Sequence, residues 1–339
     1  MILALLAGSA LLIETGAGST FSVADAPENA EISLHRIVVE EDRLPSVFST
    51  VERKGSRLIL RPTYPLSPGE TYLARVTVED ELVASLEYRH KPPENQAPPK
   101  VIKIYPGTET VPANLLKFYI EFYQPIREGR EIFEQIHIVD ESGKAVHDPW
   151  RRQELWSNNN RRLTLWIHPG RIKQGVNLRE ELGPVLLPGK HYHLLIDESL
   201  QNPAGLKMGT PFRHSFRTTD ERRQRIDLAQ WKILPPSEKG GSLTIQTNRA
   251  IDPFLAERYL RIQREGKLIE TTVKADRSQT RFELYHTEGW ASGNYTLQVG
   301  EFLEDLAGNT TRRVFDTDLS NPDQKPGPES KSFSLDLPE

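Results

Sequence analysis

The 339-residue sequence contains no cysteine. This absence excludes disulfides, zinc sites built on thiolates, thiol nucleophiles and a lipidated N-terminal cysteine. The net charge of −4 does not indicate a basic surface for nucleic acid, so no nucleic-acid partner is predicted. The sequence also lacks a Gly-x-Ser-x-Gly elbow, a phosphate-binding loop, a dinucleotide fingerprint and a His-Glu-x-x-His motif. Surface carboxylate pairs are expected from 47 acidic residues by number alone, and we therefore predict that the protein is not an enzyme.

Long hydrophobic runs are scarce as well. The apolar run at residues 2–13 is shorter than the roughly 20 residues of a spanning helix, so no transmembrane span is predicted. The run resembles the apolar segment of a secretory signal peptide, and small residues follow at 16–18, where a signal peptidase would cut. No Lys or Arg precedes Arg36, so a buried first strand is the alternative. We expect residues 1–18 to be a signal peptide.

Three stretches of the sequence share a Gly, a Tyr soon after it, and then apolar residues in alternation. They are LSPGETYLARV (66–76), LLPGKHYHLLI (186–196) and WASGNYTLQV (290–299). Each follows a strand-like segment that begins with Arg, namely RLILRP (57–62), RLTLWIHP (162–169) and RFELYH (281–286). In the last two copies a turn comes next, NPAGL (202–206) and DLAGN (305–309). The common order indicates a repeat whose pitch is that of an independent β-sandwich domain.

The repeat predicts an all-β protein of tandem immunoglobulin-like (Ig-like) β-sandwich domains. We place the domains at residues 19–92, 98–219 and 229–335, and the middle domain carries an insertion at 170–184. In each copy the Tyr is expected on the core side of its strand, where its hydroxyl can fix the preceding loop.

The connections are predicted from composition. The Pro-rich segment 91–100 reads as a stiff linker, the charged segment 218–227 as a solvated linker, and the polar, Pro-rich C-terminus as a tail. Residues 127–139 and 254–266 show helical spacing that turns into strand-like alternation, so one helical turn at most is expected in each.

The repeated stretches resemble a known family. PLSPGETYLARV, LLPGKHYHLLI and SGNYTLQVGEFLEDLAGN are similar to the closing half of bacterial Ig-like domains of the SbsA type, found in S-layer and other surface proteins. PPKVIKIYPGTETVPANLLKFYIEFYQPI (98–126) is similar to their opening half. The resemblance covers residues 98–220 and 231–318 and implies an Ig-like fold with no stated activity.

The segment 148–171 holds three of the five Trp residues. In RLTLWI the inward positions are Leu163, Leu165 and Ile167, so Thr164 and Trp166 are expected to point outward. An outward Trp beside Arg and Asn suits the stacking of a sugar. Alternatives are a satellite core under the insertion 170–184, or a contact between domains. The candidate ligand surface consists of Trp150, Arg151, Trp156 and Trp166, with part of Trp150 or Trp156 left exposed.

The sequence contains candidate ligands for a histidine metal site and for a calcium site, and neither site is predicted outright. His191 and His193 share one face of a strand, but chelation needs a third ligand, such as His168 or His214. Asp305 and Asn309 in the DLAGN turn, or the acids of DTDLSNPD (316–323), could bind calcium, although a tight turn explains the first equally well. We predict no cofactor, with calcium left open.

These observations predict a non-catalytic, exported Ig-like protein that serves as a structural, adhesion or assembly module of the bacterial cell envelope. Its location would be extracellular or periplasmic, with a protein or glycan partner at the cell surface. The alternative is a carbohydrate-binding or accessory module of a surface polysaccharide system, which depends on the Trp cluster.

Overall fold

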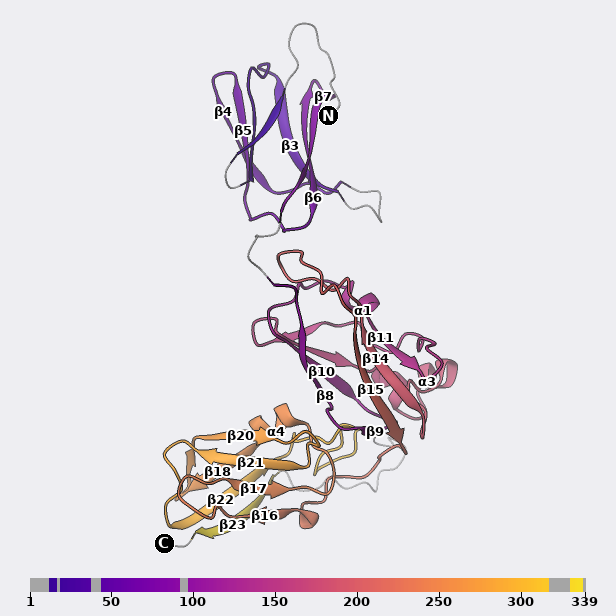
Figure 1. The fold of residues 1–339 in the computed structure, drawn as a ribbon, viewed down its shortest axis with the longest axis vertical. Coiled ribbons are helices and arrows are strands. Elements are labelled where there is room, and N and C mark those ends of the chain that lie inside the picture. The colour runs from indigo at the N-terminus through magenta and orange to yellow at the C-terminus, as the bar shows by residue number, and fades with distance from the viewer. Residues whose placement is uncertain (1–11, 17–18, 38–43, 92–96, 317–329, 338–339) are drawn as a thin grey trace. The chain divides into compact units, whose positions relative to one another are not determined.

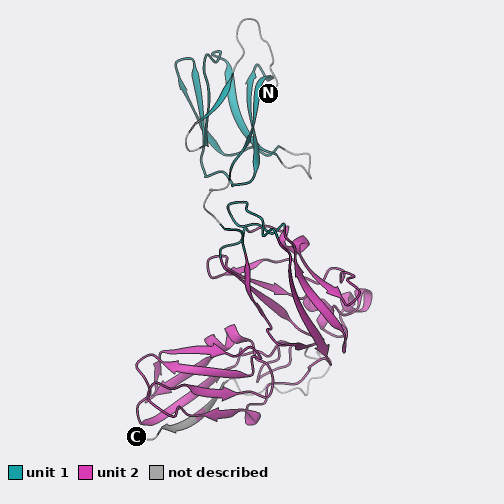
Figure 2. Ribbon diagram, viewed as in Figure 1, with its two compact units in different colours: residues 1–99, 124–127, 199–209 teal, residues 100–123, 128–198, 210–339 magenta. Residues whose placement is uncertain are grey.

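A computed structural model describes residues 12–16, 19–37, 44–91, 97–316 and 330–337, and among the side chains of 330–337 only that of Phe333. The described residues form tandem Ig-like β-sandwiches, as predicted, each made of two sheets (Figure 1). The chain divides into two compact units (Figure 2). One consists of residues 1–99, 124–127 and 199–209, and the other holds the remainder with two of the sandwiches. The domain boundaries given above stay a prediction.

The first sandwich pairs a sheet of order β1-β2-β5-β4 with one of order β3-β6-β7. Its core residues include Phe21, Leu34 and Leu60. The strands are β1 (Ile13–Gly16), β2 (Thr20–Val23), β3 (Ala30–Arg36), β4 (Ser49–Lys54), β5 (Arg57–Pro62), β6 (Thr71–Val78) and β7 (Glu81–Arg89).

Strand β1 of this sandwich lies within residues 1–18, the predicted signal peptide. Ile13 is buried in the core and pairs with Val23 across the sheet. Residues 13–16 therefore form the first strand, in which Ile13, the last residue of the apolar run, is buried and Glu14 and Thr15 are exposed. Residues 1–11 and 17–18 lie outside the described residues, so the rest of the signal-peptide expectation stays a prediction.

The middle sandwich pairs the order β12-β13-β10-β8 with β11-β14-β15-β9, in which β9 runs parallel to β15. The helices α2 (Pro169–Ile172) and α3 (Asn177–Leu182) form the insertion, and α1 (Ile132–Gln135) is the single helical turn expected before β11. The strands are β8 (Val101–Tyr105), β9 (Thr110–Pro112), β10 (Lys117–Phe122), β11 (Ile136–Asp140), β12 (Leu155–Ser157), β13 (Arg162–Trp166), β14 (His191–Ile196) and β15 (Phe212–Thr219).

The C-terminal sandwich pairs the order β16-β17-β21-β20 with β19-β18-β22-β23. A 3-10 turn at Leu228–Gln230 precedes it, and α4 (Pro253–Tyr259) leads into β18 with seven residues, which is longer than the single turn expected. The strands are β16 (Lys232–Leu234), β17 (Leu243–Gln246), β18 (Leu260–Arg264), β19 (Lys267–Ile269), β20 (Thr271–Ala275), β21 (Arg281–His286), β22 (Gly293–Gly300) and β23 (Ser330–Leu337).

The prediction of a C-terminal tail is wrong for residues 330–337. These residues form β23, which pairs antiparallel with the whole of β22, from Gly293 opposite Leu337 to Gly300 opposite Ser330. Their polar, alternating sequence hid a strand because an edge strand needs apolar residues on one side only. Pairing with β22 satisfies backbone groups that would otherwise form an open sheet edge.

The recurring tyrosines play the structural part that was predicted for them. The hydroxyl oxygen of Tyr72 accepts a hydrogen bond from the backbone N–H of Ser67 at 2.8 Å. That of Tyr192 accepts from Leu187 at 3.0 Å. Tyr295 accepts from the N–H of Ala291 at 3.0 Å and donates to its carbonyl at 3.1 Å. Each ring is buried in its core, so each repeat ties the loop before its Tyr strand to the strand itself.

The charged segment 218–227 is not the solvated linker that was expected. The backbone N–H of Arg222 donates to Asn114 Oδ1 at 2.8 Å, and its carbonyl accepts from Asn114 Nδ2 and Asn309 Nδ2 at 2.9 and 3.0 Å. Ile226 is buried in the C-terminal core. Composition could not reveal this, because the partners that satisfy the linker backbone come from both flanking sandwiches.

Candidate functional site

The three Trp residues of the middle sandwich do not form one surface. Trp150 is only 2% exposed, its indole N–H donates to the Ile136 carbonyl at 2.8 Å, and its ring packs edge-on against Phe118. The candidate ligand surface was therefore wrong to include Trp150. Its backbone forms a bridge with Ile167, an inward position of the neighbouring segment, so its side chain enters the core.

Trp156 lies apart from Trp166, whereas Arg151 neighbours it through the backbone. Trp156 stands opposite the buried Leu163, on the core side of β12, and its half-buried ring packs against Phe122. Arg151 is exposed, and its backbone N–H donates to the Trp166 carbonyl at 2.8 Å. Trp156 and Trp166 thus occupy opposite faces of the sheet, and only Trp166 has the outward orientation that a stacking platform requires.

Trp166 points outward, as the alternation in RLTLWI predicted. It lines a cavity of about 1140 Å³ together with residues 173–176 of the insertion and residues of the segment 301–316 that follows β22. The insertion therefore lies beside Trp166, as expected. The opposite wall, from residues 301–316, belongs to the next sandwich.

The insertion is held in place by one buried arginine. The Arg171 guanidinium donates to the carbonyls of Gly183, Pro184 and Leu182 at 2.9, 3.2 and 3.3 Å, and to those of His147 and Asp148. Burial lowers the pKa of Arg171. These contacts satisfy a buried cation and several loop carbonyls at once, which fixes the wall that carries Lys173.

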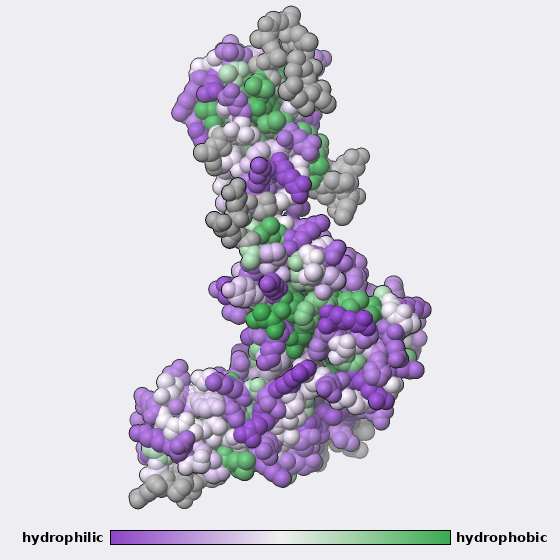
Figure 3. Space-filling model, in the orientation of Figure 1, coloured by the Kyte–Doolittle hydropathy of each residue, from purple (hydrophilic) through white to green (hydrophobic). Residues whose placement is uncertain are grey.

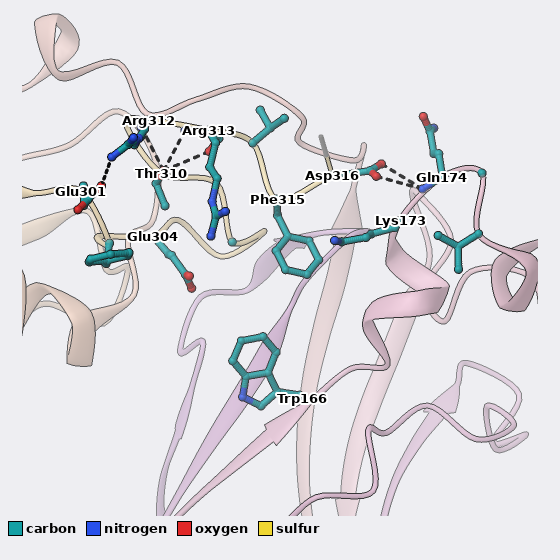
Figure 4. A pocket seen from close by; sticks show the side chains of 15 residues that line it. Trp166, Lys173, Gln174, Glu301, Glu304, Thr310, Arg312, Arg313, Phe315 and Asp316 are labelled. Carbon is teal, nitrogen blue, oxygen red and sulfur yellow. Dashed lines mark hydrogen bonds and ion pairs between the residues drawn. The ribbon is translucent and has the colours of Figure 1, made fainter. Parts of the chain in front are cut away.

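Figure 4 shows how charged and aromatic side chains meet in this cavity. The Lys173 ammonium lies 5.1 Å from the centre of the Phe315 ring, and the Arg313 side chain points toward the space between Phe315 and Glu304. On the rim, Arg312 pairs with Glu301 at 2.6 Å. Trp166 forms the lower wall in this view.

Behind the cavity, a buried ion cluster joins the middle and C-terminal sandwiches. Lys117 from β10 places its ammonium 2.9 Å from Asp252 Oδ2 and 2.8 Å from Glu304 Oε2. Tyr119 donates its hydroxyl to the same Asp252 oxygen at 2.6 Å. The other oxygen of Asp252 caps α4 by accepting from the N–H groups of Phe254 and Leu255. We call Lys117, Tyr119, Asp252 and Glu304 the junction cluster.

The pKa values in the junction cluster are set by burial and by the charges of neighbouring side chains. Burial raises the pKa of Glu304, and the Lys117 ammonium offsets only part of this effect. For Lys117, burial favours the neutral amine, but the two carboxylates outweigh it and raise the pKa of Lys117. Burial and the Asp252 carboxylate raise the pKa of Tyr119. At neutral pH the lysine stays charged and the tyrosine stays a hydrogen-bond donor.

Aromatic contacts surround the same joint. The Arg162 guanidinium lies 3.6 Å from the centre of the Phe254 ring and pairs with Glu121 at 2.7 Å. Phe254 also packs edge-on against Tyr119 with ring centroids 4.6 Å apart. Sequence reasoning missed this joint because its members come from two repeats. The available signal was Lys117, a charged residue on β10 directly opposite Trp166 in the sheet register.

The two metal hypotheses are not supported by the geometry. His191 and His193 lie on the outer face of β14, whereas His214 faces inward against Phe216 and His168 caps α2 by accepting from the Gly170 N–H. Among the described residues, no group of three His, Asp or Glu side chains could hold a metal ion.

In the DLAGN turn, protein donors already use the oxygens that calcium would need. Asp305 accepts from Arg249, from Asn309 Nδ2 and from the N–H groups of Ala307 and Asn309. Burial raises the pKa of Asp305 even with these donors in place. Of the second calcium candidate only Asp316 is described, and it pairs with Arg223. The remaining acids of 316–323 lie outside the described residues.

Comparisons with known proteins show no family for this chain. No family model matches the sequence, and no curated protein matches it. Among solved structures, the N-terminal part of the bacterial S-layer protein SbsC is 14% identical over 60% of this chain and 41% of that chain, with a TM-score of 0.27. The FN1–FN3 domains of chicken CNTN1 are 10% identical over 96% of this chain and 97% of theirs, with a TM-score of 0.23. The I9–I11 tandem of titin is 10% identical, covers 84% and 89%, and has a TM-score of 0.20.

The surface gives two further observations. Most of the face in Figure 3 is hydrophilic, and hydrophobic residues gather over parts of the N-terminal and middle sandwiches. In the described part of the chain, no helix is both long and apolar enough to cross a membrane.

Proposed function

We propose that this protein is a non-catalytic Ig-like module of the bacterial cell envelope, with a structural, adhesion or assembly role outside the cytoplasm. The observation that carries the proposal is the joint between the middle and C-terminal sandwiches. Tandem domains move relative to each other by default unless their interface is extensive. Here two sets of polar contacts connect the sandwiches. One is the junction cluster, and the other is the pair of hydrogen bonds that Asn114 and Asn309 make with the Arg222 backbone. A stiff pair of sandwiches suits a spacer or an assembly unit.

The test is localisation in the bacterial host. Cells are fractionated, and intact cells are treated with a protease that does not enter the cytoplasm. We expect the protein in the envelope or secreted fraction, with digestion in intact or outer-membrane-permeabilised cells. A cytoplasmic enzyme serves as the control for lysis. Recovery of the protein solely with that control would contradict the proposal.

A second candidate function is carbohydrate binding by the middle sandwich. The observation that favours it is the cavity lined by Trp166, because an outward indole beside polar side chains is suited to stacking on a sugar. The site of binding would then be this cavity, and not the surface that includes Trp150. Binding of oligosaccharides to the purified protein tests it.

A further inference from the structure

The charged side chains of the cavity beside Trp166 are unevenly paired. Each of its three acidic side chains already has a cationic partner: Glu301 pairs with Arg312, Glu304 with Lys117, and Asp316 with Arg223. Its two remaining basic side chains, Lys173 and Arg313, have no carboxylate partner among the described residues. Lys117 is shared between Glu304 and Asp252, and Arg223 between Asp316 and Glu221, so the lining as a whole is close to neutral. Lys173 and Arg313 nevertheless have no carboxylate of their own, and an anionic group placed between them would supply one.

The position of these cations relative to the aromatic rings narrows the choice of anion. Arg313 and Lys173 reach into the cavity from opposite walls, with Phe315 between them and Trp166 below (Figure 4). Phe302, which also lines the cavity, is 54% exposed. Aromatic faces pack well against the C–H face of a pyranose ring, and a guanidinium matches the two oxygens of a carboxylate. A ring that bears a carboxylate would use both features together.

The remaining lining groups suit the hydroxyls of a sugar. The carboxylate oxygens of Glu301 and Glu304 have further lone pairs that can accept from hydroxyl groups. The cavity is large enough for more than one sugar ring, since binding pockets of roughly 300–1,000 Å³ hold drug-sized ligands.

We propose that this cavity binds an acidic saccharide, with the carboxylate of a hexuronate residue held by Arg313 and Lys173 and its ring packed on Trp166 or Phe315. The inference rests on the second candidate function, carbohydrate binding, and goes further by naming the cavity and the charge of the ligand. It is independent of the envelope proposal, whose localisation test uses no ligand.

Calorimetric titration of the full chain with trigalacturonate at low ionic strength tests the proposal. The neutral α-1,4-linked galactose trimer is titrated in parallel, and inorganic phosphate is added as a competitor. We expect trigalacturonate to bind, the neutral trimer to bind at least tenfold more weakly, and phosphate at equal concentration to leave the affinity unchanged. Tenfold corresponds to the loss of one charge-assisted hydrogen bond.

The variants Arg313→Gln and Lys173→Gln locate the site. Each should weaken trigalacturonate binding about tenfold. Arg217→Gln is the matched control, because Arg217 is exposed on β15 and its loss changes the net charge equally. Binding should also change the intrinsic fluorescence of the wild type, and the change should shrink in Trp166→Phe. Circular dichroism checks that each variant is folded.

Each contrary result overturns a defined part of the inference. Absence of trigalacturonate binding at millimolar concentration overturns it entirely. Equal affinity for the neutral trimer refutes the acidic ligand while keeping carbohydrate binding. Full competition by phosphate refutes the sugar and leaves a general oxyanion site. Equal losses in Arg313→Gln and Arg217→Gln refute the location.

Discussion

Replacing Lys117 with methionine removes the cation of the junction cluster while keeping a side chain of similar length. Lys117 is 7% exposed, and its ammonium contacts one oxygen each of Asp252 and Glu304. The substitution leaves two carboxylates without their cation in a poorly solvated place. The Lys117 ammonium lies 5.7 Å from the centre of the Tyr119 ring and 5.2 Å from that of Trp166, so the end of the methionine side chain would face the same rings.

The loss of stability depends on which hydrogen-bond donors each carboxylate keeps after the substitution. Breaking a buried ion pair by removing one partner costs about 3–5 kcal/mol. Asp252 keeps the Tyr119 hydroxyl and two backbone N–H donors, whereas the side chain of Glu304 is 23% exposed and gains water. We therefore expect the lower end, about 3 kcal/mol. For a cooperative unit of this size, 1 kcal/mol shifts the melting temperature by about 2–4 °C, which gives a decrease of roughly 6–12 °C.

Differential scanning calorimetry of the full chain measures this shift. The double variant Lys117→Met with Glu304→Gln should recover part of the loss, since it removes one of the two uncompensated charges. Lys144→Met, at an exposed lysine in the turn after β11, is the control for loss of a lysine. A decrease of less than about 2 °C in Lys117→Met, or no recovery in the double variant, would refute the argument that buried charge stabilises the joint.

Three further predictions concern the corner tyrosines, one ion pair and the Trp residues. Tyr295→Phe should destabilise the C-terminal sandwich by about 1–3 kcal/mol in urea unfolding, and more than Tyr192→Phe destabilises the middle one, because Tyr295 both accepts and donates. Equal costs would contradict the role of the second hydrogen bond. Burial raises the pKa of Glu221, but Arg179 and Arg223 outweigh it and hold the pKa below its ordinary value. The carboxylate therefore contributes stability above the ordinary glutamate pKa that is lost as the pH falls through the lower folded value, so wild type and Glu221→Gln should converge in acid. Trp150→Ala should cost about 3–5 kcal/mol in the same unfolding assay, and Trp156→Ala clearly less; a reversed order would contradict their burial.

The fold could be predicted from the sequence because its signals are local. Alternation with a period of two assigns the inward residues of β13 and β14, and the Gly-x-x-Tyr stretch contains both the hydroxyl and the nearby N–H that it binds. The helical turn before β11 was also visible in local spacing. Patterns of this kind depend on residues only a few positions apart, so one copy of the repeat is sufficient to show them.

The candidate site depended on tertiary structure, because its parts are distant in the sequence. Proximity in sequence suggested that Trp150, Trp156 and Trp166 belong together, yet strand register sends the first two into the core and the third outward. Lys117 meets Glu304 only because two sandwiches pack against each other, and Lys173 and Arg313 reach one cavity from different domains. The periodicity of hydrophobic residues along the sequence does not indicate such contacts. The sequence by itself determined the sandwiches, and the packing of one sandwich on the next decided where charge is buried and where it is left without a partner.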